Sequence, residues 1–293
     1  MTKSTLSGAV LAAFCMGIVP VAQAELEPIS DQEMGQVQGQ AMFSIDRTGQ
    51  GTEQYTRVTM GMDVEVQTNV DTVALGEDGS GTDLDIGNLS LGHIARDDTR
   101  VQIDGNTYSA GEIVPFVGEN PYLEFAERDG EIIGVRLGLG KARGTLSGDI
   151  ASFSGNLGLQ IQDEDGNVSP AALLDALGNP AGTRATHVGL SGDGTDCSAG
   201  VRCAPLGNLR SLNIGKALDD GDVGFTEDLF VSFQKEAVNW QQLTETGEPG
   251  TVIRAAEGAF LNLPTSMTID LQTLQNGIPR ERTEYIDRGV GLF

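Results

Sequence analysis

Two short glycine-rich turns carry residue types that suit metal binding. Gly79–Asp83 and Gly192–Asp196 both have the order Gly-x-Gly-x-Asp, which is typical of the calcium turns in β-roll repeats. The glycines leave backbone carbonyls accessible and the aspartate supplies a hard oxygen ligand, so Asp83 and Asp196 are candidate calcium ligands. The ions of β-rolls lie between tandem copies, whereas these two turns are far apart in the sequence. Ordinary acidic turns are therefore the favoured interpretation at both positions, and calcium binding is the alternative.

The side chains from which hydrolytic sites are usually built are scarce. The two histidines, His93 and His187, each lie in a strand-like stretch without a recognisable nucleophile motif beside them. No Gly-x-Ser-x-Gly sequence is present. The 42 acidic residues are so numerous that the sequence singles out no glycosidase pair. We therefore expect no enzymatic activity, no catalytic residues and no cofactor, with a secreted hydrolase of polysaccharide or lipid that uses carboxylates as the alternative.

Two cysteines lie close together in a glycine-rich loop. Once a signal peptide containing Cys15 is removed, Cys197 and Cys203 are the only cysteines left. In an oxidising compartment such a pair predicts a disulfide that restrains the loop, and two free thiols are the alternative. A zinc site usually needs four ligands, and no histidine is near these two residues in the sequence.

The charge balance excludes several classes of partner. The chain of 293 residues has 18 Lys and Arg against 42 Asp and Glu, a formal net charge of −24 at pH 7. This field repels the phosphates of nucleic acids and the headgroups of anionic membranes. We therefore expect no nucleic-acid partner. The 39% of apolar residues is typical of a globular chain with a buried core.

The first 24 residues have the order of a secretory signal peptide. Lys3 is followed by the apolar run Ala9–Val21 and then by Ala22-Gln23-Ala24, small residues typical of a cleavage site. The run is shorter than the roughly 20 residues that a membrane-spanning helix needs, and a membrane anchor is the alternative. We expect cleavage before Glu25 and export across the inner membrane. The processed chain would reside outside the cell, at its surface or in the periplasm, without a transmembrane segment.

The chain after the signal is dominated by alternating polarity. From Thr56 to Val70 every even position is apolar or Thr and every odd position is polar or Gly. This period of two predicts a strand with one buried and one solvent-exposed face, on the order of 50 Å long if unbroken. Val58, Met62, Val64 and Val66 should then face the core. A hairpin is predicted at Arg128-Asp129-Gly130, between the strands Tyr122–Ala126 and Ile133–Leu139. Further strands are expected at Phe153–Ile161, Leu206–Ile214, Leu229–Phe233, Thr251–Leu263 and Met267–Leu271.

Helix signals are few. Ser30 and Glu33 stand at capping-box spacing and predict a helix over Ser30–Gln38. A second helix is predicted over Pro170–Leu177, because Ser169 precedes it as a cap and proline suits the first position.

These patterns predict a mostly β fold: an elongated antiparallel sheet, a sandwich or an irregular solenoid-like arrangement, with a short N-terminal helix and one short internal helix. The expected organisation is a signal peptide over 1–24, an N-terminal helical segment over 25–40 and a single β-rich domain over 41–293.

The segment directly after the signal resembles a known signature. Leu26-Glu-Pro-Ile-Ser-Asp-Gln-Glu-Met-Gly-Gln-Val-Gln-Gly-Gln40 is similar to the N-terminus of a family of poorly characterised exported proteobacterial β-rich proteins, loosely associated with pili and the cell surface. The likeness covers roughly the first fifteen residues after the signal, and beyond Ile45 only the style of alternating strands is shared. The resemblance implies export and a non-enzymatic surface role, and it supplies no catalytic residues.

We therefore expect an exported, acidic envelope or extracellular protein with a structural, adhesive or assembly role. Its partners would be other envelope or surface proteins, and its sheet edges would permit self-association. An N-terminal docking helix would present Ser30, Glu33, Met34 and Val37. An outer-membrane β-barrel is a further alternative, although one Trp and four Tyr are too few to build two aromatic girdles.

Overall fold

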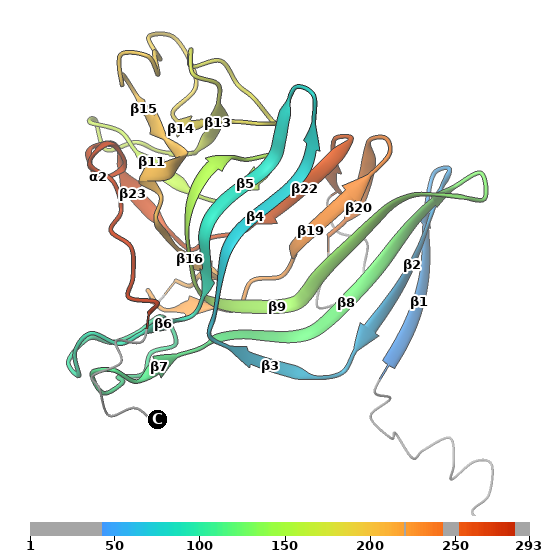
Figure 1. Cartoon of the computed structure of the whole chain (residues 1–293), viewed down its shortest axis with the longest axis horizontal. Coiled ribbons are helices and arrows are strands. Elements are labelled where there is room, and N and C mark those ends of the chain that lie inside the picture. The colour runs from blue at the N-terminus through green and yellow to red at the C-terminus, as the bar shows by residue number, and fades with distance from the viewer. Residues whose placement is uncertain (1–42, 220, 243–251, 285–293) are drawn as a thin grey trace, which may run out of the picture. The chain divides into compact units, whose positions relative to one another are not determined.

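The computed structural model describes residues 43–219, 221–242 and 252–284 (Figure 1). The chain divides into two compact units, 1–40 and 41–293, and every described residue belongs to the second. Strands predominate in it, which confirms the predicted mostly β class. The predicted signal peptide and the predicted helix with Ser30, Glu33, Met34 and Val37 lie outside the described residues.

A main sheet forms the frame of this unit. Six of its strands follow one another as antiparallel neighbours in the order β1, β2, β8, β9, β19 and β22, and β10 continues the sheet parallel to β22. The turn between β8 and β9 is the predicted Asp129-Gly130, where φ is 53° and 83°. The strands are β1 (Phe43–Gln50), β2 (Glu53–Met60), β8 (Phe116–Arg128), β9 (Glu131–Ser152), β19 (Leu229–Gln234), β22 (Gly258–Leu263) and β10 (Gly155–Leu157).

The long strand β9 connects two parts of the sheet, as its curved path in Figure 1 shows. It pairs with β8 as far as Arg143, and from Gly144 onward it pairs with β16 and β5. A Cβ at Gly144 would lie 2.8 Å from the Cα of Phe116, and its φ of 150° disfavours other residues. A glycine is therefore required where the partners change. The strands that join here are β16 (Ser211–Ile214), β5 (Gly81–Leu91) and β4 (Thr68–Asp78).

The prediction of one strand from Thr56 to Val70 is wrong. The segment is divided among β2, β3 (Asp63–Val66) and β4, with breaks at Gly61–Met62 and at Gln67. Both β2 and β3 pair with β8, whereas β4 turns away to pair with β5. The expected burial is only partly observed, because Met62 is 48% exposed and the other three expected core residues are half-buried. Those residues are Val58, Val64 and Val66.

The predicted helix over Pro170–Leu177 is also wrong. Pro170 ends β12 (Val168–Pro170), which pairs with β11 (Gln160–Gln162). The turn after the next strand, β13 (Ala172–Leu174), is held by Asp175, whose Oδ1 accepts hydrogen bonds from the amides of Leu177 and Asn179 at 2.8 and 2.9 Å. Such an aspartate turn competes with helix formation. The described α-helix is instead α2 (Leu271–Asn276), capped by the Asp270 side chain.

Small sheets and a 3₁₀-helix complete the described chain. They are β11 (Gln160–Gln162) with β12 (Val168–Pro170) and β23 (Thr268–Asp270); β13 (Ala172–Leu174), β14 (His187–Gly189) and β15 (Cys203–Pro205); β6 (His93–Ile94) with β7 (Ile113–Val114); β17 (Lys216–Ala217) with β18 (Val223–Gly224); β20 (Val238–Gln241) with β21 (Val252–Ala255); and the 3₁₀-helix η1 (Leu206–Asn208).

Two hydrophobic cores stabilise these elements. The larger core gathers side chains from β5, the second half of β9 and the segments from β10 to β16, including Ile86, Ile150 and Leu212. The smaller core lies between the main sheet and the β20–β21 hairpin, around Trp240. None of the helices in the described ranges has the length and apolar character needed to cross a membrane.

Candidate functional site

The register of the main sheet aligns one apolar row across six strands. Ile45 on β1 is opposite Val58 on β2, and the row continues through Leu123, Leu137 and Val231 to β22. Directly opposite residues of an antiparallel pair point to the same side, so the row lies on one face. A second row parallel to it contains two phenylalanines. We call this side the open face, and it comprises Ile45, Val58, Leu123, Phe125, Val135, Leu137, Val231 and Phe233.

The open face is partly exposed, and its residues are most exposed at the β1 end and pack against the larger core at the β19 end. Ile45 at the β1 end is 69% exposed, and Leu137 and Phe233 in the middle are 47% and 39% exposed. At the β19 end, Val231 packs against the larger core. Surface hydrophobics are normally scattered singly, so a contiguous row of this kind is a candidate interaction surface.

A cleft of about 370 Å³ lies where the open face meets the β4–β5 hairpin. Its walls are apolar side chains of β9 and β19, including Ile132, Val135 and Phe233, with the Gly76 backbone from β4 on the other side. Lys235 is the single ionisable residue of this lining. The cleft therefore suits an apolar group and extends the open face towards β22.

The opposite side of the same strands is covered by the β20–β21 hairpin. Trp240 and Val238 of this hairpin pack against Tyr55, Tyr122 and Phe230 of the main sheet. We call this side the covered face. A glycine makes room for one of its rings: a Cβ at Gly138 would lie 2.5 Å from the Tyr122 ring.

The covered face contains a fully buried cation. Arg136 has no exposed surface, and its Nε donates a short hydrogen bond to Glu124, which also accepts one from Arg57 at 3.0 Å. The Arg136 guanidinium lies 4.9 Å from the centre of the Phe230 ring and 5.1 Å from that of Trp240. An ion pair and aromatic faces offset the cost of burying this charge, so the arginine holds the hairpin to the sheet.

A second buried acid of the covered face is also fully engaged. Burial tends to raise the pKa of Glu53, but hydrogen bonds from the Tyr55 hydroxyl and the Arg128 guanidinium outweigh it, and the net pKa is lowered. The pKa of Tyr55 is raised by its burial and by Glu53. A general acid needs a raised carboxyl pKa, whereas the pKa values of Glu53 and of seven aspartates are lowered: Asp78, Asp97, Asp104, Asp163, Asp175, Asp196 and Asp270.

Among the described strands, β1 forms an edge of the main sheet. It pairs with β2 on one side, and on its other side no strand of the described ranges pairs with it. Gly51 and Thr52 form a two-residue loop, so Gln50 and Glu53 are the hydrogen-bonded closing pair. Odd-numbered residues of β1 therefore direct their N–H and C=O groups outward. The sequence showed that this segment begins the β region, but not that it lies at an edge.

The first calcium candidate acts as a counter-ion. Asp83 is buried, its Oδ1 accepts a hydrogen bond from Arg184 Nε at 2.8 Å, and its Oδ2 accepts one from the Ala259 amide at 2.8 Å. Gly76 and Gly258, both with positive φ, leave room for this carboxylate, because a Cβ at either would lie within 2.3 Å of it. Asp83 thus ties the β4–β5 hairpin to β22. Nothing in the sequence pointed to Arg184 as its partner.

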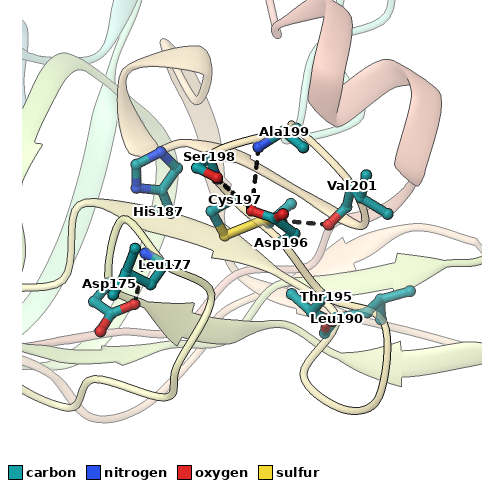
Figure 2. The surroundings of a disulfide bond; sticks show 12 residues. Asp175, Leu177, His187, Leu190, Thr195, Asp196, Cys197, Ser198, Ala199 and Val201 are labelled. Carbon is teal, nitrogen blue, oxygen red and sulfur yellow. Dashed lines mark hydrogen bonds between the residues drawn. A yellow bond between two sulfur atoms is a disulfide. The ribbon is translucent and has the colours of Figure 1, made fainter.

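The second candidate organises the disulfide loop (Figure 2). The exposed Asp196 accepts hydrogen bonds at Oδ1 from the Ser198 hydroxyl at 2.6 Å and from the amides of Ser198 and Ala199, and these bonds lower its pKa. Asp83 and Asp196 have different partners and are not brought together. Within the part of the chain that the structure describes, no three His, Cys, Asp or Glu side chains cluster as metal ligands. Calcium binding at these turns stays a prediction.

The cysteine prediction is confirmed and the histidines are placed. Cys197 and Cys203 are joined, with their sulfurs 2.11 Å apart, and Figure 2 shows the bond at Cys197, between Asp196 and Ser198. His93 is buried and its Nε2 is hydrogen-bonded to Gln102 at 3.1 Å. The Nδ1 of His187 is hydrogen-bonded to the neighbouring Thr186 hydroxyl at 2.9 Å. Each ring is thus held by a neutral side chain, unlike the histidine of a catalytic triad.

Comparison with known proteins adds no relative: the chain matches no family model, no curated protein and no solved structure. The open face and the edge of β1 are therefore the features of the described chain that bear on function.

Proposed function

We propose that this is an exported, non-catalytic protein of the cell envelope or cell surface that takes part in assembly or adhesion by binding another chain along β1 and the open face. The observation that carries the proposal is the apolar row that crosses six strands and ends at the exposed Ile45 on an open sheet edge.

Physical chemistry supports this use of the edge. An open edge strand offers a row of unpaired backbone groups, and proteins usually protect such edges with charges, proline or a bulge. Strand β1 has only Asp46 and Arg47 as charged residues, contains no proline and pairs with β2 without a register shift. An added strand would satisfy its backbone groups, and apolar side chains of that strand would pack beside Ile45 on the open face.

The composition supports the surface role. The strongly negative charge keeps an exported chain soluble and limits non-specific binding to anionic membranes. The disulfide between Cys197 and Cys203 is of a kind found in oxidising compartments, which agrees with the proposed export. The buried charges of the covered face are paired, and their contacts hold elements together.

The test combines localisation with site-specific crosslinking in the producing cell. The untagged full chain is expected outside the cytoplasm, and a photoreactive residue at Ile45 is expected to form one discrete adduct. Leu177 is the matched control, since it is also apolar and 70% exposed but lies in a turn after β13. A cytoplasmic location, or equal crosslinking from both positions, would overturn the proposal.

A further inference from the structure

We infer that the chain bound at the β1 edge is a second copy of this protein, paired antiparallel with β1 around a two-fold axis at Ile45. This inference rests on the proposed function and names the partner of the same edge.

Alternate residues of β1 have backbone groups that point away from β2. Phe43, Ile45, Arg47 and Gly49 direct their N–H and C=O groups away from β2, as the hairpin register requires. The side chains of Phe43, Ile45 and Arg47 lie on the same side of the sheet as Val58. A strand added here is fixed in register by these odd-numbered residues.

The symmetry of a pair of identical chains restricts the register. A two-fold axis perpendicular to the sheet keeps the open faces of both copies on the same side, and then odd residues pair with odd residues and even with even. The axis must pass through a residue that is opposite its own copy. Within the charged middle of β1 the choices are Ile45, Asp46 and Arg47.

Charge decides among the three registers. An axis at Asp46 places two carboxylates directly opposite each other, and an axis at Arg47 does the same with two guanidinium groups; both arrangements are destabilising. An axis at Ile45 pairs the two isoleucines. It also places Phe43 opposite the partner's Arg47, where a cation can lie on the ring, and Ser44 opposite the partner's Asp46, where a hydroxyl can donate to a carboxylate. Of these three registers, the one with its axis at Ile45 has no like charges directly opposite each other.

This pairing extends the apolar row of the open face. Ile45 is the most exposed residue of the apolar row, and its neighbour in the row is Val58. In the paired state the row would run from one copy across both Ile45 side chains into the other copy. The contact thus places the two Ile45 side chains next to each other and joins two main sheets into one.

The association state is measured first. Light scattering of the purified full chain during size exclusion, over a hundredfold range of concentration, is expected to give twice the mass of one chain at the upper end. Ile45→Lys places two ammonium groups at the axis and is expected to abolish the dimer, whereas Leu177→Lys is expected to leave it unchanged. A monomer throughout, or equal loss of dimer in both variants, would overturn the inference. Circular dichroism of both variants shows that they are folded.

Cysteine crosslinking then tests the register, in a chain with Cys15 changed to Ser. Ile45→Cys is expected to form a disulfide-linked dimer under mild oxidation. Phe43→Cys and Arg47→Cys are expected to stay unlinked singly, because in this register two copies of either residue are offset by about 13 Å along the strands, beyond disulfide reach. A mixture of these two variants is expected to link. Self-linking of Asp46→Cys in preference to Ile45→Cys would overturn the axis at Ile45.

These results also separate the inference from the proposed function. If the chain is monomeric and the photoreactive residue at Ile45 captures a different envelope protein, the second-copy inference fails and the proposed function stands. If the photoreactive residue captures a lipid, or if the chain is cytoplasmic, both fail.

Discussion

The two faces of the main sheet differ in the polarity of their side chains and in how far those side chains are buried. The covered face carries charged side chains, with Glu124 and Arg136 buried beneath the β20–β21 hairpin. The open face carries aliphatic and phenylalanine side chains, yet Leu137 and Phe233 keep much of their surface exposed. Burial in this sheet is thus decided by where the hairpin lies rather than by side-chain polarity. A face that is apolar but left open is the one available to a partner.

The largest difference in stability between the two faces is expected when one aromatic ring is removed from each. Trp240→Ala leaves a cavity in the smaller core and is expected to lower the free energy of unfolding by about 3–5 kcal/mol. Phe233→Ala on the open face is expected to lower it by about 1 kcal/mol, since the ring is already 39% exposed. Urea unfolding measures both. Equal losses would show that the open face is as well packed as the covered one.

The next effect concerns the buried cation. Arg136→Met removes the guanidinium and leaves Glu124 buried with Arg57 as its ion-pair partner, at an expected cost of about 3 kcal/mol. Arg210→Met is the control: Arg210 is largely exposed and 3.9 Å from Asp149, so its loss is expected to change stability by less than about 0.5 kcal/mol. Adding Glu124→Gln to Arg136→Met should restore part of the stability. No recovery in the double variant would contradict the ion-pair explanation.

The strand content could be predicted because alternating polarity directly reports the geometry of a strand. The β8–β9 hairpin followed from Asp129-Gly130, whose residues tolerate positive φ. The Cys197–Cys203 bond followed from closeness in the sequence. In each case the determining residues are neighbours along the chain, so local chemistry was sufficient.

The covered side of the sheet could not be predicted because it depends on distant residues. The hairpin that buries Glu124 is formed by β20 and β21, far from β2 and β8 in the sequence. Asp83 fitted a calcium turn, and its contact with Arg184 exists only in the folded chain. Pro170–Leu177 had helix signals, but pairing with β11 and β14 overrode them. Tertiary contacts override the local secondary-structure propensity where the two favour different structures.

A smaller effect should appear in the pH dependence of the covered face. The pKa of Glu53 is lowered in the folded chain from its ordinary value of 4.5, because the hydrogen bonds from Tyr55 and Arg128 outweigh the effect of burial. Its contribution to stability is therefore complete above pH 4.5 and is lost as the pH falls through the folded pKa. Glu53→Gln is expected to reduce the fall in stability between about pH 5 and 3. An unchanged slope in urea titrations over that range would contradict this.

The smallest effect is expected from the middle of the open face, and one strand supplies its own control. Leu137 and Leu146 both lie on β9, but Leu137 is 47% exposed and Leu146 is buried in the larger core. Leu137→Ala is expected to lower the free energy of unfolding by less than about 1 kcal/mol, whereas Leu146→Ala should cost about 2–4 kcal/mol. Because the residue type, the strand and the substitution are the same, a difference between the two losses in unfolding free energy reflects how deeply each leucine is buried. Both losses in the free energy of unfolding are measured at a concentration where the chain is monomeric. An equal loss at Leu137 and Leu146 would mean that this face is already covered within one chain. A partner would then have no apolar surface there to bind.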